Sequence, residues 1–490
     1  MADFSVNPFF ILMKQKCHRL VITLKCQPSF FAAKIITMKK LLLATAIGLL
    51  PILAPAQETE TYDKDGTSVP ARVYFKDGKL HFASKNEKFH LWFDNRIYID
   101  GSYYAPTSDI TGLSSKPNKD LEEDDGIFRF NNGVSIRRAR FALKAELYNW
   151  FAEFDLDFAY NEVEIKDMFL GYRFNDHISI QAGHFKEPMS MERLTSSKYL
   201  SSNERPMPVE MFAGGRRLGI AATAWNKHWW VSGGVFGQQV DIIQKEKNRG
   251  SDGYGFTGRV AVSPVVNDVL TLHLGGYATY RTPDAAGEED RLVEFRTFPE
   301  SRTDRRRFVR AEIPNVNHYA TYGIEAAVRW DKLLVYGEYI FTDLSRYKRG
   351  TDGMKQPLKN ATFNGWYATA SYMILGKQRR YSPEDAEFGP MEVRRKGGNL
   401  EISARASHVN LNDFHDASSV ITGGKAYAYN ATLNWYPIRN VLLGLNYTFV
   451  DNDKYADDKG HITQNGLSLS QVRPEGIDFN IIQLRLLVSF

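Results

Sequence analysis

Hydrophobic and polar residues alternate with a period of two along most of the chain after residue 88. Segment 476–490 shows the pattern most clearly: Ile482, Leu484 and Leu486 fall on one face, and Gln483 and Arg485 fall on the other. Such alternation predicts β-strands with one apolar and one polar face. Helical periodicity is almost absent, and no apolar run of about 18 residues, the length of a membrane-spanning helix, follows Gln57. We therefore expect an all-β chain.

The alternating segments predict about sixteen antiparallel strands, an even number as in bacterial membrane barrels. They run over 89–104, 133–147, 150–160, 163–174, 177–186, 216–226, 228–240, 253–264, 269–282, 317–331, 332–344, 360–374, 399–412, 422–436, 439–451 and 476–490. Long connections, such as 187–215 and 283–316, alternate with tight turns, such as Tyr148-Asn149. Segment 375–398 is the exception, because it is long although its order in the chain places it among the tight turns.

Three features favour a transmembrane barrel over a soluble sandwich, which also alternates. The predicted strands exceed the usual length of about five or six residues. Their apolar faces are aliphatic in the middle and aromatic near the short turns, as at Trp150, Trp225 and Trp435, and rings of this kind favour the membrane–water interface. Their other faces carry charged and small polar groups. Strands can cross a bilayer only as a closed barrel, so we predict an antiparallel β-barrel with lipid outside and water inside.

Residues 38–56 have the organisation of a secretory signal peptide. Met38-Lys39-Lys40 supplies a positive start, 41–54 is apolar, and Ala54-Pro55-Ala56 places small residues before a cleavage point after Ala56. Residues 1–37 precede this complete signal and are interpreted as a mis-start, with a genuine extension as the alternative. We expect 57–88 to be a short periplasmic segment with a hairpin at Asp77-Gly78, and 89–490 to be the barrel.

The formal net charge of the chain is different once residues 1–56 are removed. The 490 residues include 62 basic and 57 acidic ones, with a formal charge of +5 and a sequence pI near 8.8. Residues 1–56 hold seven of the basic residues, one of the acidic ones and both cysteines, Cys17 and Cys26. Residues 57–490 therefore carry a formal charge of −1 and no cysteine. This argues against a nucleic-acid partner and against chemistry that needs a thiolate.

Opposite charges line the first predicted hairpin. One strand presents Arg138, Arg140 and Lys144, and the next presents Glu153, Asp155 and Asp157. A turn at Tyr148-Asn149 places Lys144 opposite Glu153 and Arg140 opposite Asp157. The two opposed rows either form ion pairs that keep water in the lumen, or they produce an electric field across the lumen that orients permeating ions. The same alternation along the strands predicts that four isolated arginines also face the lumen: Arg259, Arg329, Arg405 and Arg485.

Segment 183–220 interrupts the strand pattern. Alternation stops near Lys186, Pro188 and Pro206 prevent ladder pairing, and Gly214-Gly215 permits an unusual backbone. The segment follows the fifth strand, where a third external loop would fold into the lumen, although an ordinary surface loop is the alternative. An inward loop would narrow the pore and supply cationic donors to anions. The candidate anion-binding residues are Lys186, Arg193, Lys198 and Arg205 in this loop and Arg138, Arg140 and Lys144 on the wall.

Other motifs do not support an enzyme, a metal site or a cofactor. Asp451-Asn452-Asp453 begins like a calcium loop, but Tyr455 and Ala456 stand where a ligand and Gly are needed. The acidic cluster Asp120–Asp125 is interpreted as solvated, or as bridged by divalent ions to lipopolysaccharide. No P-loop, HExxH or GxSxG motif occurs.

Two stretches closely resemble the signature of the phosphate-selective porin O and P family: FKEPxSxExLTSSxY at 185–199 and ERxxPxxxFAxGRxLGI at 204–220. SIRRARFALKAEL at 135–147 resembles the family's first hairpin, and GKQRRYSPED at 376–385 resembles the segment after its twelfth strand. The terminal LRLLVSF resembles the last strand, ending at Phe490, that outer-membrane assembly machinery recognises. The resemblance implies a trimeric sixteen-stranded channel of a Gram-negative outer membrane, in contact with lipid and lipopolysaccharide, with a basic inner loop that selects anions.

We therefore expect a passive porin for small anions, with phosphate and polyphosphate as candidates. Three alternatives remain open at this point: a general or sugar-permeable porin, an outer-membrane enzyme such as a barrel lipase, and a structural barrel with a plugged lumen. A barrel lipase would need a Ser/His pair at the lipid rim, and the inward His273 has no evident serine partner in the sequence.

Overall fold

The computed structural model describes residues 59–62, 68–107, 130–237, 239–240, 250–251, 253–283, 285–286, 291–462 and 476–490. The chain divides into two units, Met1–Gln57 and Glu58–Phe490. The proposed mis-start 1–37, the proposed signal peptide 38–56 and the acidic cluster Asp120–Asp125 lie outside the described residues. Within the described ranges, no helix has the length and apolar character needed to cross a membrane.

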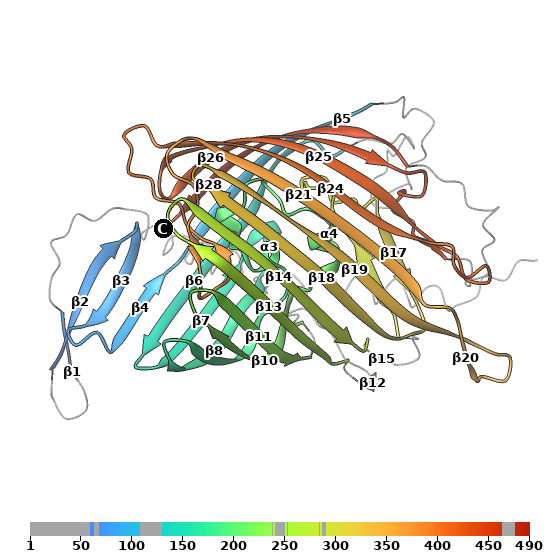
Figure 1. Cartoon of the computed structure of the whole chain (residues 1–490), viewed down its shortest axis with the longest axis horizontal. Helices are drawn as coiled ribbons and strands as arrows, with labels where there is room; N and C mark the ends of the chain where they lie inside the picture. The colour runs from blue at the N-terminus through green and yellow to red at the C-terminus, as the bar shows by residue number, and fades with distance from the viewer. Residues whose placement is uncertain are drawn as a thin grey trace, which may run out of the picture. The chain divides into compact units, whose positions relative to one another are not determined.

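Sixteen strands of the second unit form one closed antiparallel sheet (Figure 1). They are β5 (Arg96–Pro106), β6 (Gly133–Leu147), β7 (Trp150–Asp157), β8 (Glu164–Asn175), β9 (Ile178–Lys186), β10 (Arg216–Trp225), β11 (Trp229–Phe236), β13 (Gly255–Val266), β14 (Leu270–Arg281), β18 (Val316–Trp330), β19 (Leu333–Arg349), β21 (Ala361–Leu375), β24 (Asn399–Asp413), β25 (Ile421–Ile438), β26 (Val441–Asn452) and β28 (Phe479–Ser489). The last strand pairs with the first, with Ile481 opposite Tyr104, and this pairing closes the barrel. The predicted barrel of about sixteen strands is confirmed.

The two faces of each strand meet different surroundings, as the alternation predicted. On β28, Ile482 and Leu484 are 49% and 61% exposed, whereas Gln483 and Arg485 are buried inside the barrel. Leaving one such aliphatic side chain in water instead of burying it costs roughly 1.5–3 kcal/mol. The outer surface of the barrel repeats this pattern on strand after strand. An apolar band of that extent is stable only against lipid.

A short sheet extends the barrel wall at the end where the tight turns lie. The strands are β1 (Thr59–Tyr62), β2 (Ser68–Lys76), β3 (Lys79–Ser84) and β4 (Phe89–Phe93). β4 pairs with β6 and leads directly into β5, and β3 adds to the free edge of β4, with His81 opposite Trp92. The predicted hairpin is present: Asp77 and Gly78 both have positive φ, as a two-residue hairpin turn of the primed type requires.

The connection from β9 to β10, residues 187–215, folds into the barrel as predicted. It contains α3 (Met191–Leu194), the 3-10 turn η2 (Ser197–Tyr199) and α4 (Met207–Phe212). Its polar groups bond to the far wall: Ser202 Oγ lies 3.1 Å from Asn430 Oδ1, and Ser403 Oγ on β24 donates to the carbonyl of Ser201 at 2.9 Å. We call residues 187–215 the inner loop.

Two further connections enter the barrel, which the sequence did not predict. The long loop between β14 and β18 reaches the far wall through Glu300, which accepts hydrogen bonds from Arg405 and Ser407. The segment between β21 and β24, at the opposite end, places the Tyr381 hydroxyl 2.8 Å from His273 Nδ1. The remaining short elements lie in connections: η1 (Ala159–Asn161), β12 (Gly250–Ser251), β15 (Ala285–Ala286), β16 (Val293–Arg296), β17 (Arg310–Ile313), β20 (Lys355–Pro357), β22 (Tyr381–Ser382), β23 (Glu387–Phe388) and β27 (His461–Ile462).

The lumen is not polar along its whole length, and this corrects the sequence expectation. Met207 and Phe212 of α4 pack with Phe295 of the β14–β18 loop and with Ile340 and Phe363 of the wall in one buried apolar cluster. Inward apolar residues on β19 and β21 therefore hold the loops against that side of the barrel. The open space remains on the opposite side, along β5 to β10.

Candidate functional site

A cavity of about 1190 Å³ lies between the inner loop and the wall formed by β5 to β10. The described residues that line it include fifteen Lys or Arg residues and eight Asp or Glu residues. The formal charge of −1 over residues 57–490 therefore hides a local basic excess. All seven predicted anion-binding residues line this one cavity: Lys186, Arg193, Lys198, Arg205, Arg138, Arg140 and Lys144.

The charged rows of the first hairpin have the predicted register. Arg140 lies opposite Asp157, and Lys144 lies opposite Glu153. The Arg140 guanidinium donates to Asp157 at 3.0 Å, and the Lys144 ammonium lies 2.9 Å from Glu153. Arg140 also bonds to Asp155 at 3.2 Å. These pairs fix the cations on the cavity wall and offset part of their charge.

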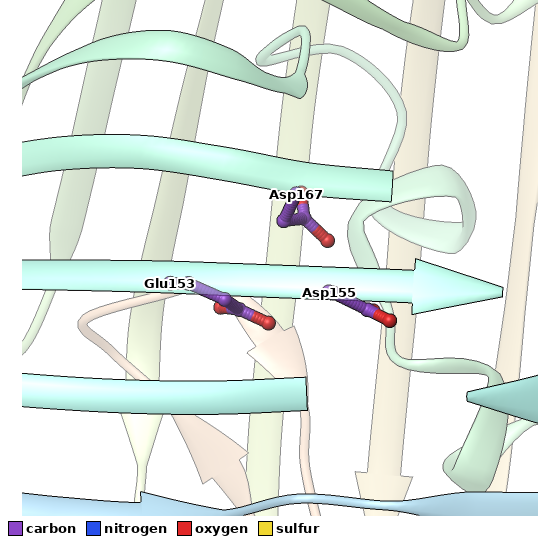
Figure 2. Close-up of side chains that lie close together, drawn as sticks. All are labelled: Glu153, Asp155 and Asp167. Carbon is purple, nitrogen blue, oxygen red and sulfur yellow. The ribbon is translucent and has the colours of Figure 1, made fainter. Parts of the chain in front are cut away.

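Three carboxylates on this wall lie close together: Glu153 and Asp155 on β7 and Asp167 on β8 (Figure 2). One oxygen of each lies within 4.8 Å of the others, a spacing that a hard cation could use. Each carboxylate has a cationic neighbour, however, and the shortest contact joins Arg216 to Asp167 at 2.6 Å. A metal ion would have to compete with these cations, so the group fits an ion-paired wall better than a metal site.

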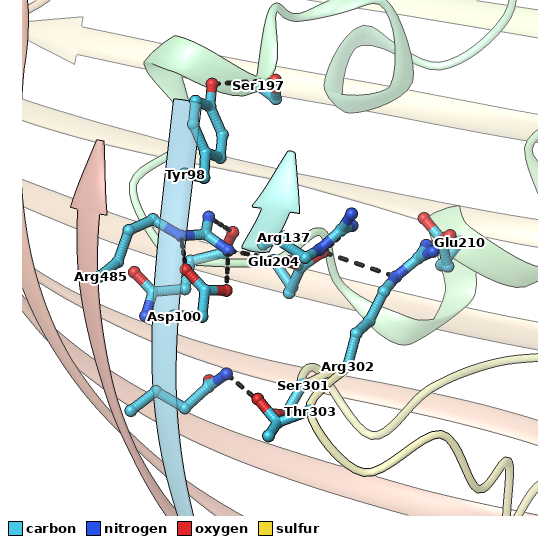
Figure 3. Close-up of polar contacts among 12 residues, drawn as sticks. Tyr98, Asp100, Arg137, Ser197, Glu204, Glu210, Ser301, Arg302, Thr303 and Arg485 are labelled. Atoms are coloured by element: carbon cyan, nitrogen blue, oxygen red, sulfur yellow. Dashed lines mark hydrogen bonds and ion pairs between the residues drawn. The ribbon is translucent and has the colours of Figure 1, made fainter. Parts of the chain in front are cut away.

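A β-bulge turns two consecutive arginines toward the lumen. Arg138 pairs with Tyr98, but the next pair joins Ile136 to Ile99, so Arg137 is an extra residue in the ladder. The Arg137 guanidinium bonds to Glu204 of the inner loop at 2.6 and 2.8 Å (Figure 3). Strict alternation points Arg137 toward lipid, so the sequence did not identify it.

Arg138 differs from its neighbours because it forms no ion pair with a described residue. Its guanidinium lies over the Tyr98 ring at 5.8 Å from the centroid, and its Nε has no hydrogen-bond partner among the described residues. It is buried within the wall at the edge of the cavity. Arg138 therefore offers uncompensated positive charge to the cavity.

Arg193 and Arg205 of the inner loop, and Lys186 at the end of β9, bond mainly to backbone carbonyls of that loop. Arg193 donates to the carbonyls of Val209 and Ala213, and its ion pair with Glu210 is longer, at 3.4 Å. Arg205 donates to carbonyls only, and Lys186 donates to the carbonyl of Leu194 at 2.5 Å. A carbonyl orients a cation without cancelling its charge, so these side chains stay available to a passing anion.

Lys198 lies at the end of the cavity nearest the tight turns. Its ammonium donates to Asp94 at 2.6 Å, and Lys79 also contacts Asp94, at 3.1 Å. Burial lowers the pKa of Lys198 to about 7; Asp94 opposes this shift, and the nearby Arg96 adds to it. The charge of Lys198 therefore changes near neutral pH.

The mouth at the long-loop end carries three arginines from the β14–β18 loop, which the sequence did not identify. Arg302 and Arg307 lie over the Phe298 ring, at 4.6 and 4.5 Å from its centroid, and Arg305 lies over Tyr160 at 4.4 Å. Arg302 also bonds to Glu210, which ties the two loops together (Figure 3). No local sequence signal places these residues, because their position depends on loop folding. Lys79, Arg96, Lys166 and Arg216 also line the cavity and were not among the predicted residues.

A closed sixteen-stranded barrel with an apolar outer surface and a charged internal passage defines an outer-membrane porin. The model of the family "Phosphate-selective porin O and P" matches residues 118–487. The chain belongs to this family, and it is an outer-membrane anion porin.

Known proteins similar to this chain include two relatives and one solved structure. An uncharacterized protein of Caulobacter vibrioides is 26% identical over 397 residues, covering 78% of this chain and 72% of that protein. Porin O of Pseudomonas aeruginosa is 22% identical over 381 residues, covering 71% and 84%. An anion-selective porin from Comamonas acidovorans is similar in fold, with a TM-score of 0.48 and 12% identity, covering 82% of this chain and 100% of that one.

Proposed function

We propose that this porin passes small anions by passive diffusion and favours oxyanions of the phosphate type. The observation that carries the proposal is the set of cations in the cavity that form no ion pair with a described residue: Arg138, Lys186, Arg205, Arg305 and Arg307. A passage lined by charge of one sign raises the local concentration of counter-ions. Guanidinium groups suit oxyanions in particular, because they donate parallel hydrogen bonds to two oxygens.

Cations, some unpaired and some ion-paired, mark a path from the long-loop end of the cavity to its tight-turn end. Arg305 and Arg307 lie at the mouth beside the long loops, which we assign to the outside of the cell. Arg138 and Arg205 lie deeper, and Lys144 and Lys198 lie near the tight turns, which we assign to the periplasm. An anion would exchange part of its hydration for successive cationic donors along this path.

The acidic residues of the wall help a bound anion to leave the cations of the cavity. Asp157 and Glu153 offset the charge of Arg140 and Lys144, so neither cation binds a passing anion with its full charge. Conduction requires binding that is favourable enough for entry and weak enough for exit. A wall of mixed charge with a basic excess meets both requirements, without any covalent step.

The assembly of the porin is part of the proposal. We infer that residues 38–56 direct export and are removed after Ala56, and that residues 57–88 stay on the periplasmic side. The apolar band on the outer surface contacts lipid, and the long-loop end contacts lipopolysaccharide. Three copies of the chain form a trimer. The terminal Phe490 would be the residue that outer-membrane assembly machinery recognises. N-terminal sequencing of membrane-extracted protein reads the cleavage point directly.

Block of chloride current by phosphate tests the anion preference. In planar bilayers with fixed chloride, added phosphate should reduce the current in a saturable way, because both anions use the same cations. Arg138→Gln should raise the half-blocking phosphate concentration about tenfold or more, since hydrogen bonds to charged groups contribute roughly 1.5–3 kcal/mol. Arg346→Gln is the control, because Arg346 is buried away from the cavity and bonds to Ser419.

A current that does not respond to phosphate would contradict the preference for phosphate-type anions. A channel that also passes neutral sugars at comparable rates would favour the alternative of a general or sugar-permeable porin.

A further inference from the structure

The short helix α3 of the inner loop begins against two acidic residues of the barrel wall. The amide of Met191 donates to Glu325 Oε2 at 2.8 Å, and the amide of Glu192 donates to Glu338 Oε1 at 2.9 Å. Glu325 lies on β18 and Glu338 lies on β19, on the side of the barrel away from the cavity. The two carboxylates therefore hold the start of α3 from across the lumen.

Glu338, on β19, accepts hydrogen bonds from two other wall strands, β14 and β21, and from the inner loop. In addition to the amide of Glu192, it accepts the hydroxyl of Tyr277 at 2.8 Å, that of Tyr367 at 2.9 Å and that of Ser190 at 2.9 Å. Its side chain is 4% exposed. Every one of these bonds is accepted by the carboxylate, and two of them come from the inner loop. Glu338 thus joins β14, β19 and β21 to the loop.

Glu325 is held in place by cationic and imidazole partners. Arg259 Nε donates to Glu325 Oε1 at 2.8 Å, and His273 Nε2 lies 3.0 Å from the same oxygen. Its other oxygen is the one that accepts the amide of Met191. The wall residues therefore orient Glu325 with one oxygen free for the loop.

Ser190, the residue before α3, has a backbone conformation that its residue type disfavours. Ser190 has φ of 60°, in the left-handed region that residues other than glycine avoid. Its hydroxyl accepts the amide of Arg193 at 3.1 Å and donates to Glu338. The contact with the wall thus helps to keep a strained backbone in place.

The carbonyls of α3 and of the residue after it accept hydrogen bonds from the cations of the cavity. Lys186 donates to the carbonyl of Leu194, and Arg205 donates to the carbonyls of Glu192 and Thr195, at 2.9 and 2.5 Å. These carbonyls belong to the turn whose amides Glu325 and Glu338 hold. The side-chain orientation of two unpaired cations, Lys186 at the end of β9 and Arg205 in the inner loop, therefore depends on two carboxylates on the opposite wall.

We infer that Glu338 and Glu325 are positioning residues for the anion channel: they fix α3 from the far wall and so hold the carbonyls that orient the side chains of Lys186 and Arg205 at the cavity. The effect on selectivity rests on the proposed function, whereas the effect on loop position does not. Neither carboxylate lines the cavity, so neither acts on a permeating ion by contact. When α3 is released, Lys186 and Arg205 lose the carbonyls that orient their side chains.

Three variants test this inference. Glu338→Gln and Ser190→Ala each remove part of the attachment, one from the wall and one from the loop. Thr342→Val is the matched control, because Thr342 lies on the same strand and inner face as Glu338 but bonds to Thr321 of the wall. Because Ser190 belongs to the loop, Ser190→Ala leaves the barrel wall intact if Glu338→Gln folds poorly.

Two measurements are made on each folded variant. The first is the anion-to-cation permeability ratio in planar bilayers, which a purely structural role would leave unchanged. The second is the rate at which a charged thiol reagent modifies Ser196→Cys, at a lining position of the cavity, in a chain that also carries Cys17→Ser and Cys26→Ser. We expect the permeability ratio to fall and the modification rate to change by about threefold or more in Glu338→Gln and Ser190→Ala. The Thr342→Val variant should match the parent in both.

The outcomes separate the inference from the proposed function. A parent channel without anion preference would refute the proposed function, and the modification rates alone would then decide whether the carboxylates position the loop. Parent-like permeability and parent-like modification in folded Ser190→Ala and Glu338→Gln would overturn the inference. An equal response in Thr342→Val would overturn the inference as well. The loss of any hydrogen bond of the wall would then be enough to change the permeability ratio and the modification rate.

Discussion

At the scale of single residues, the electrostatics of this porin depend on which cations are paired. Arg140 and Lys144 face carboxylates across one hairpin, whereas Arg138, only two residues from Arg140, has an aromatic neighbour instead. Composition cannot reveal such a distinction, since the charge of residues 57–490 is −1 while the cavity is basic. Parity along a strand identified the inward cations on β6. It failed at Arg137, because a bulge breaks the strict alternation of inward and outward residues along β6.

The response to pH can be predicted from two groups outside the sixteen barrel strands. Burial lowers the pKa of Lys198 to about 7, and burial together with Asp385 raises the pKa of Glu387 to about 8. As pH rises from 6 to 9, Lys198 loses positive charge and Glu387 gains negative charge. Both changes act in the same direction, so the anion-to-cation permeability ratio should fall.

Permeability ratios measured at several pH values check this prediction. Lys198→Gln is the control and should lack the step near pH 7, while Asp94 keeps its contact with Lys79. A ratio that rises with pH, or that is flat in the parent, would contradict the assignment.

At the scale of elements, local hairpins were predictable and folded-back loops were not. The register of β6 and β7 follows from the turn at Tyr148-Asn149, because each inward residue then has one possible partner. The inner loop carried its own signal, in prolines that stop the strand pattern after Lys186. The β14–β18 loop enters the barrel through contacts such as Glu300 with Arg405, which join residues far apart in the sequence. Alternation and turn signals carry no information about contacts of that kind.

A charge swap tests whether the β6–β7 register contributes to stability. Lys144→Glu places two acidic residues opposite each other, and the free energy of unfolding should fall by roughly 0.2–1 kcal/mol. Adding Glu153→Lys restores opposite charges and should recover most of that loss. Urea unfolding in lipid vesicles measures both steps. If the double variant is no more stable than Lys144→Glu alone, the two residues do not interact across the hairpin.

At the scale of the whole molecule, the barrel is divided into a filled side and an open side. Closure itself followed from the sequence, because strands that face lipid must pair at every edge. The division did not, since it depends on an apolar cluster between α4, the β14–β18 loop and wall residues such as Phe363. The cluster confines the passage to the wall from β5 to β10, where the cations gather. A wide barrel thereby becomes a narrow and charged channel.

The zero-current potential of the purified porin tests the central claim most directly. With a potassium chloride gradient across a planar bilayer, an anion-selective channel develops a potential of the sign set by chloride. We predict that sign for the parent chain, with a magnitude that decreases when salt on both sides screens the cavity charges. A potential of the opposite sign, set by potassium, or no potential at all, would contradict an anion channel built on the unpaired cations of this cavity.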